Sequence, residues 1–259
     1  MSSEVVLLTK TKYTSDIIEW VKHYTECGFD HILIYDNDSF TDLTDLFKSN
    51  DKVTVKRING WPNQLALYNE AYQNNDKYDW QFFCDDDEFL WFDKTKWNNI
   101  NSFLNEIPKY VTQYGVYWQF MSSSKLEKER NDYTIPVTKY YTKTPNCEYK
   151  SHLKTFIRKD CVGSFVTPHY LYTLNSLRII TELGACTNPN EPFKVINPID
   201  LPIKLFHYYL QSEKELRLKF TERLPDHIEE AYRNKNTIDK AAIDLKYDTE
   251  CTQCKDWTK

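Results

Sequence analysis

The sequence predicts an α/β protein with a Rossmann-like arrangement around a mixed, mainly parallel sheet. In the first 90 residues, short apolar runs alternate with segments whose apolar residues recur at helical spacing. The connections between them are short, which favours βαβ units and parallel strands. Four consecutive acids follow the apolar run at 80–84. Open α/β sheets bind their ligands at such carboxyl ends of central strands.

The elements of the first half follow in order. A buried strand over residues 4–9 precedes a helix with apolar positions from Ile17 to Tyr24, and a second strand covers 31–35. Gly28 is typical of the position just after a helix. The alternation continues with a helix at 44–47, a strand at 53–55, a helix at 64–73 and the strand at 80–84.

Beyond residue 100 the alternation is less regular. We predict a helix at 102–110 and a polar loop or lid at 122–150. Ser212 and Glu215 have capping-box spacing and predict a helix that continues to about Arg223. Further strands are expected at 115–121, 153–158, 163–166 and 203–209. We predict one domain over 1–225 and a polar, partly helical tail over 226–259.

Composition excludes several classes of protein. The 259 residues carry a net charge of −5 without a basic block, so nucleic acid is not expected as the main partner. No apolar run approaches 18 residues, so neither a membrane span nor a signal peptide is expected. Seven scattered cysteines favour a reducing compartment, and we expect a cytoplasmic protein. Cys251 and Cys254 supply only two of the four ligands that a structural zinc needs.

The acidic run comprises Asp85, Asp86, Asp87 and Glu88, with large apolar residues on both sides. Burying one unpaired carboxylate costs several kcal/mol, and a divalent cation relieves that cost. In an extended backbone, Asp85 and Asp87 point to one side and the other two acids to the opposite side. Hard oxygen ligands suit Mn²⁺ or Mg²⁺, which often bridge to phosphate. The alternative is an acidic strand-to-loop turn that caps a helix.

Polar residues also follow the first two strands. Thr9 and Lys12 come after the first strand, and Asp36 follows the second, so these side chains are expected at the same sheet edge. Asp36 can accept hydrogen bonds from a base N–H or from ribose hydroxyls. The alternative for Asp36 is a simple turn, because the next three residues are all turn formers. Five glycines and no glycine-rich motif mean that phosphate binding must use a metal or side chains.

The second half of the chain adds four candidates. His207 lies in an apolar strand and is either a core residue or a third ligand to the metal. His169 follows a strand and is a candidate for facing an acceptor. Lys154 and Arg158 lie four apart on one strand, hence on one face, where they would neutralise a diphosphate; the alternative is a pair of ordinary surface cations.

Several of these residues form an ordered set of motifs. Glu19-Trp20 precedes His23 and Gly28, Tyr35-Asp36-Asn37-Asp38-Ser39 ends a strand, and Gln64 opens a helix. Asp85-Asp86-Asp87-Glu88-Phe89-Leu90 follows, and later come Lys154, Arg158, His169, His207-Tyr208 and Ser212. Over roughly residues 4–220 this pattern resembles the family 2-like and family 92-like (DUF23-type) glycosyltransferases of GT-A fold.

The resemblance implies a GT-A fold and the transfer of a sugar from a UDP- or GDP-sugar donor to a glycan or protein acceptor. Asp36 would contact the nucleoside, Asp85 would lie near the ribose or metal, and Asp87 and His207 would hold Mn²⁺ or Mg²⁺. His169 would face the acceptor. The rest of the donor site would comprise Thr9, Lys12, Gln64, Asp86, Lys154 and Arg158.

An inverting enzyme also needs a base that deprotonates the acceptor hydroxyl. Asp132 and Glu182 are the candidates, together with Asp87 as a catalytic residue. Many relatives carry an N-terminal membrane anchor, and this sequence shows none. Two alternatives remain: a nucleotidyltransferase or nucleotide-sugar pyrophosphorylase, and a carbohydrate-binding module without turnover. The first usually needs a glycine-rich basic loop after the first strand, which Thr9–Tyr13 does not provide.

Overall fold

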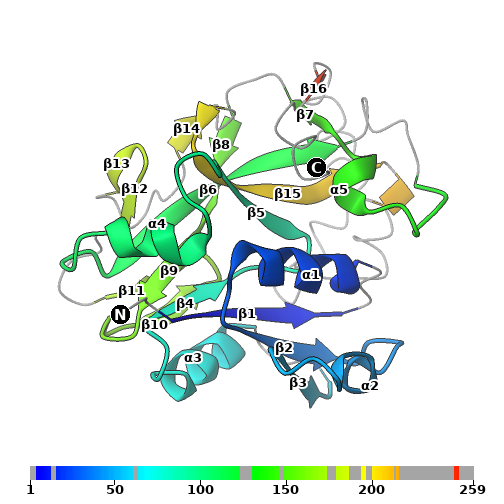
Figure 1. The fold of residues 1–259 in the computed structure, drawn as a ribbon, viewed down its shortest axis with the longest axis horizontal. Coiled ribbons are helices and arrows are strands. Elements are labelled where there is room, and N and C mark those ends of the chain that lie inside the picture. Colours follow the sequence, from blue (N-terminus) through cyan, green and yellow to red (C-terminus); the bar gives the residue numbers. More distant parts are fainter. Residues whose placement is uncertain are drawn as a thin grey trace.

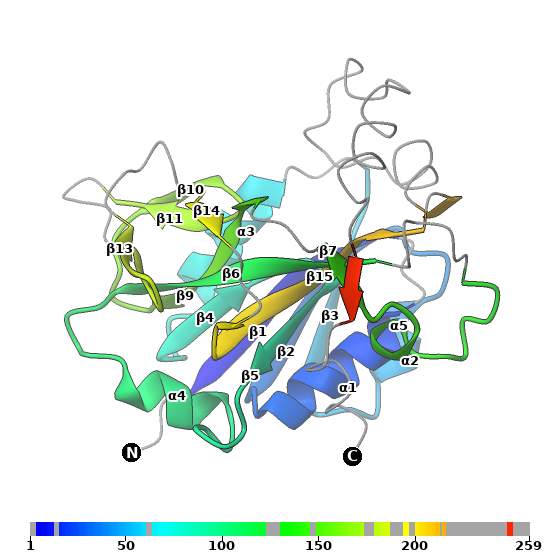
Figure 2. The same cartoon turned by 90° about the horizontal axis from the view of Figure 1, so that it is seen from above.

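A computed structural model describes the chain over most of its length. The described residues are 4–12, 16–60, 64–122, 130–145, 149–173, 179–186, 194–196, 200–212, 214–215 and 248–250. A large mixed sheet forms the centre of this part (Figure 1). Helices α1 (Ile17–Cys27) and α4 (Ile100–Glu106) lie on one face of the sheet and α3 (Gln64–Asn74) on the other (Figure 2).

The N-terminal half is a parallel βα unit. Strands β1 (Val5–Thr11), β2 (His31–Asn37), β3 (Val53–Ile58) and β4 (Trp80–Phe83) lie in the order β3-β2-β1-β4, and all three pairings are parallel. Helix α2 (Leu43–Phe47) connects β2 to β3. The carboxyl ends of these strands therefore meet at one edge of the sheet.

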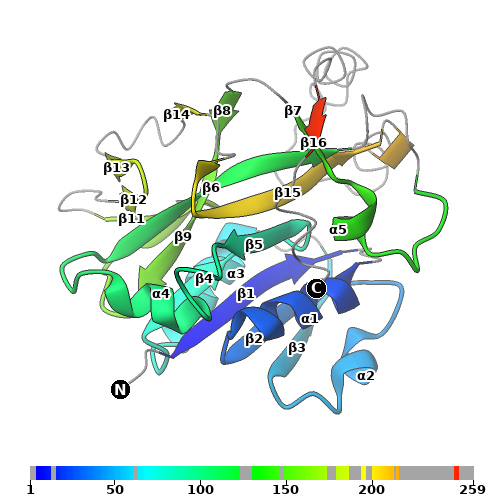
Figure 3. The ribbon, with the colours of Figure 1, turned by 45° about the horizontal axis from the view of Figure 1, so that its top comes forward.

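The second half extends the sheet with mixed strands. Strand β9 (Leu153–Arg158) runs antiparallel between β4 and β6 (Gln113–Ser122). Strand β15 (Ile203–Gln211) lies between β5 (Glu88–Phe92) and β6 (Figure 3). The smaller elements are α5 (Val137–Tyr140), β7 (Lys143–Pro145), β8 (Tyr149–Ser151), β10 (Ser164–Thr167), β11 (Tyr170–Tyr172), β12 (Ile179–Thr181), β13 (Gly184–Cys186), β14 (Lys194–Ile196) and β16 (Asp248–Glu250).

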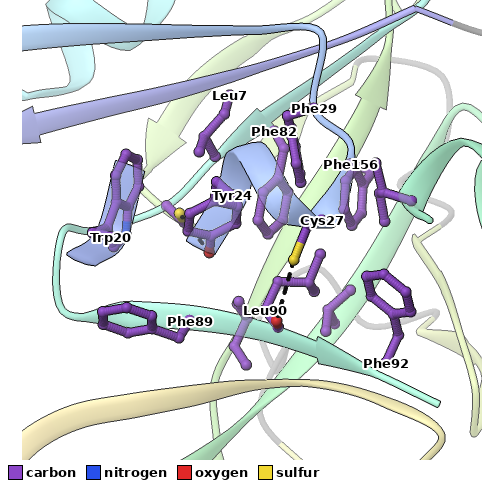
Figure 4. Close-up of a cluster of buried hydrophobic side chains, with 14 of the residues drawn as sticks. Leu7, Trp20, Tyr24, Cys27, Phe29, Phe82, Phe89, Leu90, Phe92 and Phe156 are labelled. Atoms are coloured by element: carbon purple, nitrogen blue, oxygen red, sulfur yellow. Dashed lines mark hydrogen bonds between the residues drawn. The ribbon is translucent and has the colours of Figure 1, made fainter. Parts of the chain in front are cut away.

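Alternation along the strands divides the core into two layers. In β2, Ile32 and Ile34 pack on the α1 side, whereas Leu33 and Tyr35 pack on the α3 side. Aromatic rings fill the α1 side, where the ring centroids of Phe82 and Phe156 lie 4.0 Å apart. Figure 4 shows Trp20, Tyr24 and Cys27 on the side of α1 that faces Phe89 and Leu90 of β5. Both faces of β1, β2 and β4 are thus buried, as their apolar sequences predict.

The predicted α/β class with a mixed sheet and a parallel, Rossmann-like half is confirmed. Helix α1 ends where predicted, at Gly28, whose φ of +94° is the left-handed conformation that glycine adopts easily. Helix α4 begins two residues before its predicted start, because Asn99 and Ser102 form a capping box. No helix in the described part of the chain is long and apolar enough to cross a membrane.

Three predictions concern segments described only in part. Within the predicted loop at 122–150, the described residues contain α5 and β7. Of the predicted tail at 226–259, only β16 is described, and it pairs with β7, whereas Cys251 and Cys254 lie outside the described residues. The helix predicted from Ser212 is described only as far as Glu215.

Candidate functional site

The four acids lie at the carboxyl edge of the sheet, in a turn between β4 and β5. We call Asp85–Glu88 the acidic turn. The Glu88 N–H donates to the Asp85 carbonyl over 3.1 Å, and the Asp85 N–H donates to Glu88 Oε2 over 2.9 Å. The chain turns here, so the condition of an extended backbone, under which Asp85 and Asp87 would share one side, is not met.

Two aromatic side chains of α1 donate hydrogen bonds to main-chain carbonyls of the acidic turn. Trp20 Nε1 donates to the carbonyls of Asp85 (3.2 Å) and Glu88 (2.9 Å), and the Tyr24 hydroxyl donates to the Glu88 carbonyl (3.1 Å). Trp20 and Tyr24 are fully buried. Sequence reasoning placed Tyr24 among the apolar positions of the helix and Trp20 in a motif, and it gave neither residue this role, because helical spacing reports which face is buried and not which carbonyl a ring reaches.

Both carboxylate oxygens of Asp85 accept hydrogen bonds from the protein. Gln64 Nε2, at the start of α3, donates to Oδ1 over 3.1 Å, and Lys154 Nζ, on β9, donates to Oδ2 over 3.1 Å. Gln64, Asp85 and Lys154 were all predicted donor-site residues, and the structure brings them into contact. The orientation of the Asp85 carboxylate is therefore fixed from two sides.

Glu88 and Lys154 are fully buried charged residues, with 3.9 Å between Oε1 and Nζ. Burial raises the pKa of the Glu88 carboxyl well above its usual value, and the nearby Asp85 and Asp87 charges add to this, while Lys154 opposes it. For Lys154, burial lowers the pKa, but the charges of Asp85 and Glu88 outweigh burial and the pKa is raised overall. Lys154 therefore stays an ammonium ion among acids.

The remaining two acids have separate partners. The Thr11 hydroxyl at the end of β1 donates to Asp86 Oδ2. Asp87 Oδ1 lies 3.3 Å from His207 Nε2, and the Tyr208 N–H donates to the Asp87 carbonyl over 2.9 Å. His207 comes to this position because β15 pairs antiparallel with β5, opposite Glu88.

The donor set at Asp87 and His207 fits a divalent cation in part. A carboxylate and an imidazole are common ligands of Mn²⁺, and such ions complete their shells with phosphate oxygens and water. Asp85 was predicted as a third ligand, and its two oxygens accept hydrogen bonds from Gln64 and Lys154. Among the described residues, no three His, Cys, Asp or Glu side chains form a ready metal site. A divalent cation beside Asp87 and His207 would therefore have to take further ligands, such as phosphate oxygens.

A cluster of imidazoles surrounds Trp118 on β6, next to this site. The Trp118 ring lies 4.2 Å from that of His207, 4.9 Å from that of His152 and 5.4 Å from that of His169. His152 Nδ1 and His169 Nε2 are 3.3 Å apart, and His169 Nδ1 lies 3.1 Å from the Leu153 carbonyl. Burial is the main cause that lowers the pKa of His152, to about 4, and the charge of His207 is the next. Burial also lowers the pKa of His169, followed by the charge of Lys154. His152 and His169 are therefore neutral near pH 7.

Two buried polar residues, Asp36 and Ser39, lie at the end of β2, and we call this pair the polar nest. Asp36 is fully buried, and its Oδ1 accepts the Ser39 N–H over 2.9 Å. Within the described residues, Asp36 Oδ2 and the buried Ser39 hydroxyl have no hydrogen-bond partner. Buried polar atoms are normally satisfied, so this nest is suited to donors from a ligand. Asp38 adopts a left-handed φ of +55°, which non-glycine residues adopt rarely and mainly as Asn or Asp.

The end of β1 borders the same nest. Thr9 is buried, and its hydroxyl donates to the Lys10 carbonyl (3.4 Å). Thr11 pairs with Asp36 in the parallel register, and Lys12 follows directly at the sheet edge. Sequence reasoning missed Thr11, although its position two residues beyond Thr9, on the same face, was a usable signal.

Arg158 and Glu182 are not brought to this edge. Arg158 pairs with Trp80 at the amino end of β4, stacks on its ring at 4.1 Å and donates to the carbonyl of Val111. Lys154 and Arg158 therefore do not flank one diphosphate. Glu182, in the turn between β12 and β13, accepts from the Tyr114 hydroxyl (2.7 Å) near the amino end of β6.

Asp132, the other candidate base, makes local contacts. It is exposed, and its Oδ1 accepts from the main-chain N–H and the hydroxyl of Thr134. The hydroxyl and main-chain donors of Thr134 lower the pKa of the Asp132 carboxyl. This favours a structural turn over a base, which works best with a pKa near the pH of the reaction.

Comparisons with known proteins reveal only distant similarity. No protein-family model matches the sequence, and no curated protein does. Among solved structures, the chain is similar to the crystal structure of S. aureus TarS 1-349, with 13% sequence identity and a TM-score of 0.43. The match covers 89% of this chain and 68% of that one. Such a distant similarity is no guide to activity, so the function has to be inferred from the residues of this chain.

Proposed function

We propose that the chain is a metal-dependent glycosyltransferase, which moves a sugar from a UDP- or GDP-sugar to a hydroxyl of a glycan or protein. One observation carries the proposal: the pair Asp87–His207 lies at the same sheet edge as the buried, ligand-suited Asp36. A nucleotide-diphosphate sugar needs both features, one for the nucleoside and one for the diphosphate. The motif resemblance to GT-A glycosyltransferases points the same way.

The nucleoside would bind at the end of β2. Asp36 Oδ2 is buried and acceptor-only when ionised, so it suits a base N–H or a ribose hydroxyl. Asp85 is oriented by Gln64 and Lys154, and each of its oxygens keeps a second lone pair that a ribose hydroxyl can use. These two carboxylates therefore define the nucleoside end of the proposed donor site.

The diphosphate would bind near Asp87, at the part of the acidic turn that faces His207. Asp87 and His207 would hold Mn²⁺ or Mg²⁺ there, and the bound ion would stabilise the negative charge on the departing diphosphate. His207 would contribute an imidazole nitrogen, and its ring packs against Trp118 and Phe120. The acceptor hydroxyl would approach from the side of His169, which packs against Trp118, as His207 does.

The experiment is a titration of the full chain with a panel of UDP- and GDP-sugars, with and without Mn²⁺, followed by assays of sugar release. Manganese-dependent binding of one donor, with slow hydrolysis or transfer, is the expected result. Pyrophosphate release from a nucleoside triphosphate and a sugar phosphate would instead establish a nucleotidyltransferase. Absence of manganese-dependent binding to every donor would contradict the proposal and favour a binding module.

A further inference from the structure

Lys154 orients Asp85 in the proposed donor site, and it also makes contacts that this role does not use. Its side chain is fully buried, and its ammonium group contacts two other segments of the chain. Nζ donates to Asp85 Oδ2 (3.1 Å) and to the Pro168 carbonyl (3.2 Å), and it lies 3.9 Å from Glu88 Oε1. A buried ammonium with these contacts is directed at the protein and not at a diphosphate.

The Pro168 contact joins the ammonium to the turn between β10 and β11. This turn is fastened to β9 at two further points. The Thr155 hydroxyl donates to the His169 carbonyl (3.1 Å), and His169 Nδ1 lies 3.1 Å from the Leu153 carbonyl, the arrangement in which Nδ1–H is the donor. With Nδ1 protonated in the neutral ring, Nε2 carries the lone pair, which faces His152 Nδ1.

Lys154 thus lies between the two sides of the proposed site. On one side it holds Asp85, which we assign to the donor; on the other it holds the turn that carries His169, which we assign to the acceptor. No second described residue hydrogen-bonds both the Asp85 side chain and this turn. Moving the ammonium would change the position of both.

We propose that Lys154 is a positioning residue that sets the Asp85 carboxylate and the His169 turn relative to each other. The inference rests on the proposed glycosyl transfer for the roles of Asp85 and His169. Glu88 is a second buried acid beside the ammonium, and its Oε2 closes the acidic turn. Lys154 therefore makes hydrogen bonds to Asp85 and Pro168, whereas it lies 3.9 Å from Glu88.

Two variants separate these functions. Lys154→Met keeps the length of the side chain but removes the ammonium, and it leaves Glu88 and Asp85 without a cation. Lys154→Met/Glu88→Gln removes the buried ammonium together with the buried carboxyl that faces it, while the glutamine oxygen can still accept the Asp85 N–H. Lys159→Met, on an exposed lysine beyond the end of β9, is the matched control.

In the double variant, thermal stability should recover relative to Lys154→Met, because the uncompensated buried charge is gone. Donor KM should stay raised by about 10-fold or more and kcat should stay lowered, because the hydrogen bonds to Asp85 and Pro168 are still missing. Recovery of wild-type KM and kcat in the double variant would overturn the inference.

Hydrogen exchange gives a readout that does not depend on turnover. In both variants, amide exchange in residues 167–170 should accelerate by at least about 10-fold relative to wild type, and Lys159→Met should leave it unchanged. Unchanged exchange in this turn would also overturn the inference. If wild type itself binds no nucleotide sugar, the proposed function fails, whereas accelerated exchange would still establish the link between Lys154 and the turn.

Discussion

His207 and Asp87 are joined through both their side chains and their backbones. Nε2 lies 3.3 Å from Oδ1, and the N–H of the next residue, Tyr208, donates to the Asp87 carbonyl over 2.9 Å. Asp87 and His207, which are 120 positions apart in the sequence, are therefore held in register by the pairing of β15 with β5. The site at the sheet edge is built by this pairing, and the first two predictions test it.

Asp87→Ala should lower manganese-dependent sugar transfer by about 100-fold or more, because a metal that stabilises leaving-group charge is worth several kcal/mol. The side chain is partly exposed, so the melting temperature should change little. Initial rates at saturating donor and manganese measure the effect. Asp45→Ala, on the exposed side of α2, is the control. Full activity of Asp87→Ala would remove the metal role.

His207→Ala should weaken Mn²⁺ affinity by roughly 10-fold or more, as the loss of a group that binds or orients a metal does. Manganese titrations in the presence of the nucleoside diphosphate measure this. His207→Gln is the matched variant, since it keeps a polar group of similar size. If both variants bind manganese as wild type does, His207 is a core residue that packs against Trp118 and has no ligand role.

Asp36→Ala should raise the dissociation constant of the nucleotide about 10-fold or more, because hydrogen bonds to charged groups contribute about 1.5–3 kcal/mol. Calorimetry with the nucleoside monophosphate isolates this end of the site from the metal. The Ser39 N–H also loses its acceptor, so the thermal stability of the variant has to be measured in parallel. Equal affinity for the monophosphate in wild type and variant would place the nucleoside elsewhere.

Glu19 connects α1 to α5 and gives a pH prediction. Its carboxylate accepts from the Val137 N–H (2.7 Å) and the Thr138 N–H (3.3 Å). Burial, partly offset by these hydrogen bonds, raises the pKa of Glu19 above 4.5. Between 4.5 and the raised value, the folded protein holds a proton that the unfolded chain has released, so this group's contribution to stability falls as pH rises through that window.

Glu19→Gln removes this titration. The free energy of unfolding of wild type minus that of the variant should therefore decrease from pH 4 to pH 7, on top of a constant loss of about 1 kcal/mol for the weakened hydrogen bonds. Urea unfolding at several pH values measures the difference, with Glu26→Gln on the exposed face of α1 as the control. A difference that increases with pH would contradict the direction of the shift.

The parallel half of the fold could be predicted from the sequence because both faces of β1, β2 and β4 are apolar over most of their length. The ends of these apolar runs also predicted that Asp36 and the acidic run lie at strand ends, where the structure has them. It could not give the shape of the acidic turn, because Trp20 shapes it from another element. Periodicity reports burial within a segment, whereas such contacts depend on how segments meet.

Lys154 and Arg158 illustrate the limit on the site. Their spacing puts them on one face of β9, but four residues of a strand span about 13 Å. Because β9 runs antiparallel to β4, Lys154 lies near the acidic turn and Arg158 lies at the opposite end of the sheet. No local pattern in the sequence indicates the direction of β9. The prediction therefore placed Lys154 and Arg158 at one diphosphate, whereas the fold separates them.

The indole of Trp20 and the phenol of Tyr24 bind main-chain carbonyls of the acidic turn from inside the core. A loop fastened in this way is rigid before any substrate arrives, so little conformational entropy is lost when a donor docks. Binding of the donor should then occur in one kinetic step, without a separate rearrangement of this turn. The turn should unfold only when the aromatic core unfolds.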